Sequence, residues 1–335
     1  MKKTAWILGV AVLFGLINMP AQAQEKRNFG EKLLKAARKC DINQIVKMSD
    51  EKEVTADDLN VTDANKKTIL ILLAENPSCK VALKRWHINH VIDKGVNLNA
   101  RDNAGNTALM YAVEKNDSAF VWTLIHKSSS SLREGLDVNM VDNHHRSALI
   151  LAAQTGDVSK VRFLLEREDI DVNIQDDKGY TALIYAAKGS NRDIVRALIR
   201  DRRFNSRLKV DVNKQTYAHD DYVEGGEEYG GHSALMWAVK VPNYQIVSLL
   251  IERPELDLSL TDAMYGMTAF DYAEEACKKR TTKEKVFSGD IDRIEMLLHA
   301  HMRACEEKTE KEVLDKLTRS MGKPWNPGMG TSVWW

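Results

Sequence analysis

The chain has 335 residues, with 48 basic and 48 acidic side chains, so its formal net charge at pH 7 is zero. Because there is no basic surplus, the composition does not point to a nucleic-acid-binding protein. Apolar residues make up 44% of the chain, which is ample for a continuous hydrophobic core.

Residues 1–23 have the pattern of a secretory signal peptide. A short positive segment with Lys2 and Lys3 precedes an apolar segment at residues 5–17, and Ala21-Gln22-Ala23 is a small-x-small cleavage site. The apolar segment is too short for a typical membrane span. No cysteine stands at the cleavage site, which argues against a lipoprotein. The sequence therefore predicts a mature chain from Gln24 that is periplasmic, or alternatively secreted, with no membrane insertion after cleavage.

A motif recurs along most of the remaining chain. Its clear copies are Thr107-Ala108-Leu109, Ser147-Ala148-Leu149, Thr181-Ala182-Leu183, Ser233-Ala234-Leu235 and Thr268-Ala269-Phe270. Each copy is followed by an alanine three residues later, then by a second apolar segment such as Val161–Leu165. Asp-Val-Asn follows at residues 137–139, 171–173 and 211–213. A self-similar unit of this kind indicates a stacked solenoid, and solenoids mostly bind other proteins.

The repeated unit resembles the ankyrin repeat over roughly residues 30–305. The resemblance implies an all-α solenoid of about seven helix-turn-helix units with β-turn fingers. Weaker copies lie at Asn65–Leu70 and Leu33–Ala37. Alanine or isoleucine replaces the usual proline after the Thr or Ser anchor, but the anchor hydroxyl can still cap the helix.

The domain boundaries follow from these patterns. We expect a signal peptide at 1–23, the solenoid at 24–305, a charged capping helix at 306–320 and a Gly/Pro/Trp tail at 321–335. The anchors are unevenly spaced, which places loop insertions near residues 128–131 and in an acidic, aromatic segment at 214–231.

Four cysteines remain after the signal peptide, and their places in the solenoid limit their pairing. Cys40 and Cys79 fall in the first two units, whereas Cys277 and Cys305 fall in the last. Pairing between the two ends would exceed the distance of about 7 Å that a disulfide allows between Cα atoms. The sequence therefore predicts a Cys40–Cys79 disulfide. A second pair, Cys277–Cys305, stays open, and four buried or free thiols are the alternative.

No catalytic constellation is present in the sequence, and we expect neither enzymatic activity nor a cofactor. His87 and His90 share a face of a predicted helix, but no third metal ligand accompanies them. The acidic residues of segment 214–231 could gather around a cation, but they lack the ordered spacing of a calcium loop. A solvated acidic loop is the simpler interpretation.

The finger tips are the best candidates for a binding site. The ankyrin resemblance implies that residues just before each Thr or Ser anchor project into a concave groove that binds a partner. The candidate residues are Asn106, His144, Arg146, Lys178, Tyr180, Tyr229, His232, Tyr265 and Met267. Aromatic residues, Met and Arg are enriched at protein interfaces. For Tyr180 and Tyr265 the alternative is packing of the ring against neighbouring fingers.

The sequence thus predicts a non-enzymatic scaffold that binds a partner protein, of unknown identity, in the bacterial envelope. One version of this hypothesis is a periplasmic immunity-type protein that inhibits a toxic enzyme. An alternative is a secreted effector that binds host proteins. Both rest on analogy of fold and compartment.

Overall fold

The computed structural model describes residues 21–51, 54–79, 85–115, 118–127, 135–200, 209–218, 230–279, 293–294 and 296–299. Several predictions lie outside the described residues: most of the signal peptide, the insertion at 128–131, Tyr229, Cys305, the capping helix 306–320 and the tail 321–335. The chain divides into two units, Met1–Asp211 and Val212–Trp335, which are described separately.

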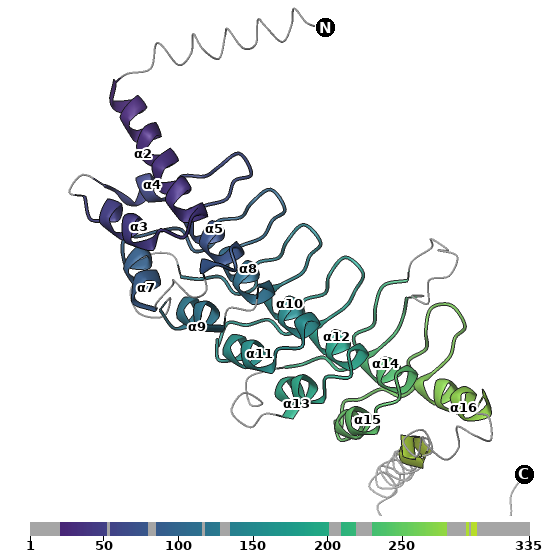
Figure 1. Ribbon diagram of the computed structural model, residues 1–335. Helices are drawn as coiled ribbons and strands as arrows, with labels where there is room; N and C mark the ends of the chain where they lie inside the picture. Colours follow the sequence, from purple (N-terminus) through teal and green to yellow (C-terminus); the bar gives the residue numbers. More distant parts are fainter. Residues whose placement is uncertain are drawn as a thin grey trace, which may run out of the picture. The chain divides into compact units, whose positions relative to one another are not determined.

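In the first unit, the helices form two rows (Figure 1). The inner row consists of α2 (Ala21–Arg38), α5 (Ile69–Glu75), α8 (Ala108–Glu114), α10 (Ala148–Thr155) and α12 (Ala182–Lys188). The outer row consists of α3 (Ile42–Ser49), α7 (Arg85–Asp93), α9 (Ser118–Lys127), α11 (Val158–Leu165) and α13 (Arg192–Arg200). A short helix, α4 (Ala56–Leu59), packs on α2. Each helix packs against its neighbours in the same row, so each repeat covers the apolar surface of the next.

The inner helices begin where the sequence predicts. The hydroxyl of Thr107 accepts a hydrogen bond from the backbone N–H of Met110, and Thr181 does the same for Ile184. Thr68, Ser147 and Ser233 cap their helices in the same way. Each cap satisfies one of the backbone donors that a helix start leaves without an intrahelical partner. The missing proline is therefore no obstacle to helix initiation here.

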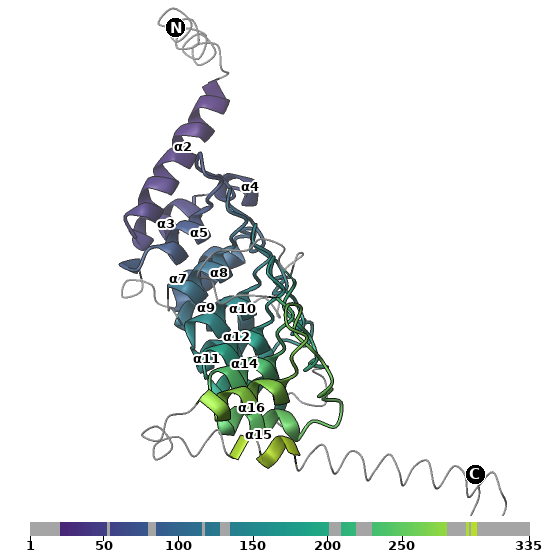
Figure 2. The ribbon, with the colours of Figure 1, turned by 90° about the vertical axis from the view of Figure 1, so that its right-hand side faces the viewer.

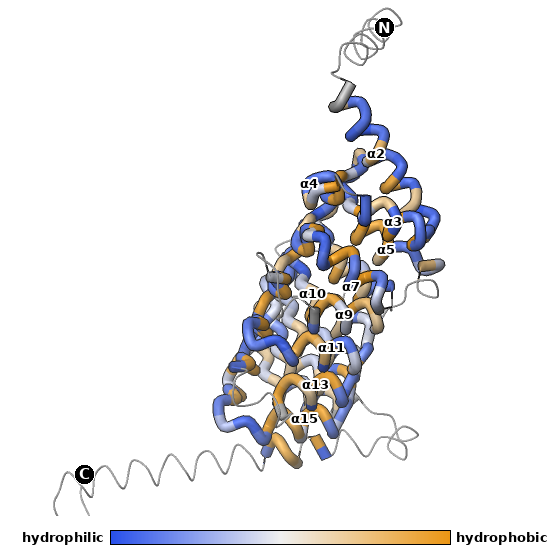
Figure 3. The backbone as a smooth tube through the Cα atoms, turned by 90° about the vertical axis from the view of Figure 1, so that its left-hand side faces the viewer, coloured by the Kyte–Doolittle hydropathy of each residue, from blue (hydrophilic) through white to orange (hydrophobic). Residues whose placement is uncertain are grey.

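The core follows from small residues on the inner row and one apolar face on the outer row. Ala152, Ala153, Ala186 and Ala187 are at most 1% exposed, so inner helices can approach closely. On the outer helix α13, the apolar positions 194, 195, 198 and 199 are buried, whereas Asp193 and Arg196 are exposed. Figure 3 shows this alternation of hydrophobic and hydrophilic positions along α11 and α13. Each buried Leu or Ile contributes about 1.5–3 kcal/mol to folding.

A ladder of asparagine side chains connects successive repeats. The amide of Asn139 donates to the carbonyl of Asp169 at 2.6 Å and its Oδ1 accepts from the N–H of Asp171 at 2.7 Å. The same pair of bonds recurs at Asn60, Asn99 and Asn173 in the first unit, and at Asn213 in the second. These asparagines belong to the Asp-Val-Asn motif or occupy the equivalent position. The motif therefore satisfies backbone groups of the next repeat.

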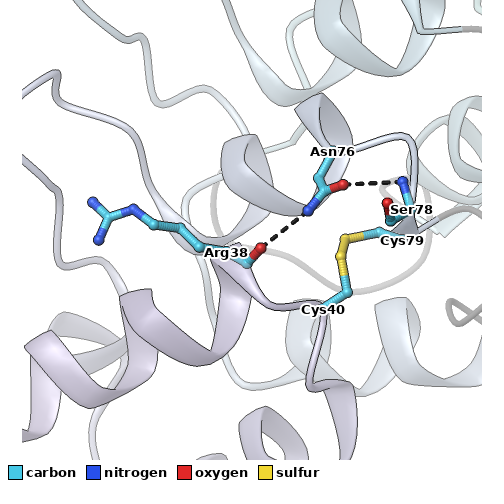
Figure 4. The surroundings of a disulfide bond; sticks show 5 residues. All are labelled: Arg38, Cys40, Asn76, Ser78 and Cys79. Carbon is cyan, nitrogen blue, oxygen red and sulfur yellow. Dashed lines mark hydrogen bonds between the residues drawn. A yellow bond between two sulfur atoms is a disulfide. The ribbon is translucent and has the colours of Figure 1, made fainter.

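A disulfide joins Cys40 and Cys79, the pair that the sequence analysis favours (Figure 4). Cys40 follows α2 and Cys79 follows α5, and their Cα atoms lie 5.2 Å apart. The amide of Asn76 donates to the carbonyl of Arg38 at 3.0 Å, alongside the disulfide. Two successive repeats are thus fastened covalently where their inner helices end.

The second unit contains α14 (Ala234–Lys240), α15 (Tyr244–Ile251) and α16 (Ala269–Lys279), with α14 packed on both of the others. Cys277 lies in α16, but its side chain is outside the described residues. Throughout the part of the chain that the structure describes, no helix is both long enough and apolar enough to cross a membrane.

Candidate protein-binding surface

The fingers are the turns that precede the inner helices, at residues 63–67, 101–106, 142–146 and 176–180 of the first unit. Figure 2 shows these turns on one side of α8, α10 and α12. The N–H of Asn103 donates to the carbonyl of Asn65 at 3.0 Å, and the N–H of Asn143 donates to that of Ala104 at 3.0 Å. Asp177 is linked to His144 in the same way at 3.1 Å. These backbone bonds hold the finger tips of the first unit in register.

An aspartate organises each finger from within. Oδ1 of Asp176 accepts from the backbone N–H groups of Lys178 at 3.0 Å and Tyr180 at 2.8 Å. Asp63, Asp102 and Asp142 accept from the N–H groups two and four residues further on in the same way. The third residue after each aspartate has a positive φ, 60° at Lys66, 80° at Gly105 and Gly179, and 56° at His145. The carboxylates of Asp102, Asp142 and Asp176 are buried.

The second oxygen of each finger aspartate binds a side chain that differs among repeats. The partners are Arg38 for Asp63, Tyr111 for Asp102, Arg146 for Asp142, Tyr185 for Asp176 and Tyr272 for Asp262. Burial and the bond to Asp176 raise the pKa of Tyr185 above its ordinary value. Burial opposes ionisation of Asp262, but donation from Tyr272 and two backbone N–H groups holds its pKa below the ordinary value. Each finger is thereby tied to an inner helix or to a neighbouring arginine.

The candidate residues at the middle of the fingers are exposed. The His144 side chain is 67% exposed and its Nδ1 lies 3.2 Å from Oδ2 of Asp177. Lys178 is exposed, and in the second unit Tyr265 is 61% exposed. The structure therefore places these candidates where a partner could contact them, and Tyr265 does not pack away its ring.

The candidates next to the helix anchors lie deeper. Tyr180 is only 5% exposed, and its ring stacks on that of Tyr185 with centroids 4.7 Å apart. Its N–H is bound to Asp176, which turns the side chain back over the inner helix. The sequence-based assignment of Tyr180 to partner contact is therefore wrong, and packing is its role. Asn106 and Arg146 are half-buried, and Arg146 donates to Asp142 at 2.8 Å.

His232 requires the same correction in the second unit. It is 1% exposed and its ring lies against Trp237 and Tyr272, with centroids 5.2 and 5.8 Å away. Nε2 lies 3.1 Å from Nζ of Lys240 and 3.2 Å from the hydroxyl of Tyr272. His232 thus supports the finger from inside. Met267 is half-buried, and Tyr229 lies outside the described residues.

Sequence reasoning did not include the exposed finger residues Lys66, Arg101 and His145 among its candidates. The signal was available, because each lies within the finger turn of its repeat. Conversely, His90 does not join His87 in a site: its Nε2 lies 3.1 Å from Asp50, and His87 is buried. Among the described residues, no group of three or more His, Cys, Asp or Glu side chains could hold a metal ion.

Comparison with known proteins agrees with this geometry. The family model described as "Ankyrin repeats (3 copies)" matches residues 33–133 and 129–216, more than half of the chain. The chain therefore belongs to the ankyrin-repeat family, whose members are generally non-enzymatic scaffolds for protein–protein interaction.

An ankyrin repeat protein of Acanthamoeba polyphaga mimivirus is 28% identical over 97 residues, which cover 29% of this chain and 22% of that protein. Among solved structures, the ankyrin repeat domain of Bcl-3, a member of the IkappaB protein family, is similar in fold. It superposes with a TM-score of 0.56 at 20% identity, covering 80% of this chain and 97% of the Bcl-3 chain. At this identity the likeness concerns the fold alone.

Proposed function

We propose that this protein is an exported, non-enzymatic scaffold of the bacterial envelope that binds a partner protein through its fingers. The observation that carries the proposal is the exposure of His144 and Lys178 on first-unit turns that backbone hydrogen bonds hold in register; Tyr265 is exposed on a finger of the second unit. A preformed surface loses little conformational entropy when it binds, so few contacts suffice for useful affinity.

Two observations support export. The Cys40–Cys79 disulfide is typical of an oxidising compartment, because cytosolic thiols are kept reduced. The pattern of residues 1–23 is that of a secretory signal peptide. We propose the periplasm as the compartment, with binding that inhibits or positions another envelope protein.

Affinity purification with crosslinking from the bacterial envelope tests the proposal. A finger variant combines His144→Ala, Lys178→Ala and Tyr265→Ala. The matched control combines Arg162→Ala, Arg196→Ala and Gln245→Ala, which are exposed on the outer helices. We expect the finger variant to bind the captured partner more weakly, by at least about 1 kcal/mol, and the control to bind as wild type.

The opposite pattern, in which only the outer-helix variant loses the partner, would reject the fingers as the interface. Cell fractionation separates the two proposed compartments. Protein recovered from the culture medium and not from the periplasm would favour a secreted effector that binds host proteins over an envelope scaffold.

A further inference from the structure

The fingers of the first unit are balanced in formal charge but sorted in space. Residues 63–67, 101–106, 142–146 and 176–180 contain five acidic and five basic side chains. The sequence alone therefore predicts a finger surface with no net charge. The structure buries three of the five carboxylates, because each turn uses an aspartate to accept hydrogen bonds from its own backbone N–H groups.

The carboxylates face inward. Asp102, Asp142 and Asp176 are 7%, 3% and 2% exposed, and each accepts hydrogen bonds from two backbone N–H groups of its own turn. Asp63 is half-buried and bound to Arg38 at 2.9 Å. Among these finger residues, the exposed carboxylate is Asp177, which lies 3.2 Å from the ring of His144.

Three of the five basic side chains and both histidines are exposed, whereas Lys67 and Arg146 are half-buried and bind Glu75 and Asp142. Lys66, Arg101, His144, His145 and Lys178 are all exposed, and we call these five residues the finger rim. Nε of Arg101 donates to the carbonyl of Gly105 at 3.0 Å, which fixes the guanidinium at the edge of its turn. The backbone bonds from Asn103 to Asn65 and from Asn143 to Ala104 align successive turns. The rim therefore places the charged groups of Lys66, Arg101 and Lys178 on three of the aligned turns of the first unit.

We infer that the finger rim binds an acidic, extended segment of the partner protein. The inference rests on the proposed function, since it names the chemistry of the partner for the same surface. Carboxylates spaced along an extended chain can meet Lys and Arg groups on successive turns, and Arg can bind a carboxylate with two parallel N–H···O bonds. Because the fingers carry equal numbers of acidic and basic side chains, recognition acts at contact and gives little long-range steering.

Fluorescence anisotropy with the full chain and a labelled peptide of about twelve glutamates tests the inference. We expect binding that weakens as salt rises from about 50 to about 300 mM, because exposed charges are screened. The rim variant K66E/R101E/K178E should bind at least about tenfold more weakly, the loss of about 1.4 kcal/mol. The control K47E/R162E/R196E makes the same charge change at exposed positions on the outer helices and should bind as wild type. Circular dichroism and melting curves establish that both variants are folded.

Unchanged affinity in the rim variant would overturn the inference, as would binding that does not respond to salt. A single-stranded oligonucleotide of similar length is the competing probe, and its preference over the peptide would reject an acidic protein segment as the ligand. If the glutamate peptide does not bind while partner capture still depends on His144, Lys178 and Tyr265, only the acidic chemistry fails. If capture ignores all finger changes, the proposed function fails with it.

Discussion

At the scale of single residues, the finger aspartate is retained while its side-chain partner changes. The Tyr185 hydroxyl donates to Asp176. In the repeat where Leu151 stands in place of that tyrosine, four residues after the anchor, Arg146 donates to Asp142 instead. In the second unit, Thr216 occupies the aspartate position before α14, and the tyrosine position is Trp237. A buried carboxylate needs a donor, and where the carboxylate is absent the tyrosine hydroxyl is absent too.

The substitution Tyr185→Phe should therefore destabilise the first unit. It removes the 2.6 Å bond to Asp176 and leaves one oxygen of a buried carboxylate without that donor. We expect a loss of about 1–3 kcal/mol in the free energy of unfolding, measured by urea denaturation. Tyr244→Phe is the control, because Tyr244 packs against Arg293 and binds no finger aspartate. Equal losses in the two variants would contradict the role of the hydroxyl.

The same hydroxyls give the stability a dependence on alkaline pH. The pKa values of Tyr185 and Tyr272 are raised by burial and by their bonds to aspartates. A tyrosine whose pKa is higher in the folded chain than in the unfolded chain stabilises the fold at pH values below the unfolded pKa of about 10. As pH rises above this value, the unfolded chain loses its tyrosine protons first, so the stabilisation is lost. Denaturation midpoints measured from about pH 9 to about pH 11 should fall less steeply in Tyr185→Phe than in wild type.

Backbone strain provides a stabilising substitution. Ser190 follows α12 with a φ of 54°, whereas Gly156 occupies the equivalent place after α10 with a φ of 74°. For residues with a Cβ atom this left-handed conformation costs about 1–2 kcal/mol. Glycine avoids that cost but gives up part of the gain, because it loses more chain entropy on folding. We expect Ser190→Gly to raise the free energy of unfolding by about 0.5–1 kcal/mol and Gly156→Ser to lower it. A thermal melt in which both changes destabilise would show that Ser190 makes compensating contacts.

At the scale of helices, close packing of the inner row is the main constraint. Ala187 on α12 is fully buried, so Ala187→Asp would place an unpaired charge between helices. We expect a loss of more than about 3 kcal/mol and a clear drop in helical circular dichroism at 37 °C. Ala104→Asp, at an exposed finger position, is the matched control and should leave the melting temperature nearly unchanged. A folded Ala187→Asp protein with wild-type stability would exclude this packing.

The helices also show what the sequence could predict. The Thr and Ser anchors, the alanines and the Asp-Val-Asn segments identified the repeat, because each satisfies a local requirement of capping, close approach or backbone bonding. The direction of individual side chains was less accessible. Tyr180 and Lys178 are two residues apart, but one is buried and the other exposed. The finger aspartate binds the backbone N–H groups of both residues, so the difference comes from the turn between them, where Gly179 has a φ of 80°.

Lys160 illustrates a second limit of the sequence. It occupies the position that Phe120, Ile194 and Ile246 hold in other repeats, and it is fully buried. Its Nζ lies 3.3 Å from Oδ2 of Asp157 and donates to the carbonyl of Val113 at 2.7 Å, at the end of the helix in the preceding repeat. A lysine normally predicts a solvated surface; the nearby carboxylate and the carbonyl that the three-dimensional stack brings to it make its burial tolerable.

At the scale of the whole molecule, each repeat contacts its neighbours, so the ends of a stack are its weakest parts. The Cys40–Cys79 disulfide closes a loop with a sequence separation of 39 at the first repeats. Such a closure is worth about 3–4 kcal/mol when it only restricts the unfolded chain. The disulfide therefore stabilises the end that has one neighbour fewer.

Reduction should consequently loosen the first repeats before the rest of the first unit. With a dithiol reductant we expect hydrogen exchange to accelerate in α2, α3 and α5 before α10 and α12, together with a lower melting temperature. The double variant Cys40→Ala/Cys79→Ala should show the same loosened state and no response to the reductant. Uniform exchange across all these helices after reduction would indicate that the unit opens as one cooperative body.

The asparagine ladder has a consequence for how such a chain can change over evolutionary time. Asn99 and Asn173 bind the backbone just after the segments 128–134 and 201–208, so the rungs connect the same positions whatever lies between them. Residues can therefore be added before each rung without changing which backbone groups these asparagines bind. Lineages can lengthen or diversify these segments, and engineers can graft peptides there, without rebuilding the contacts between repeats.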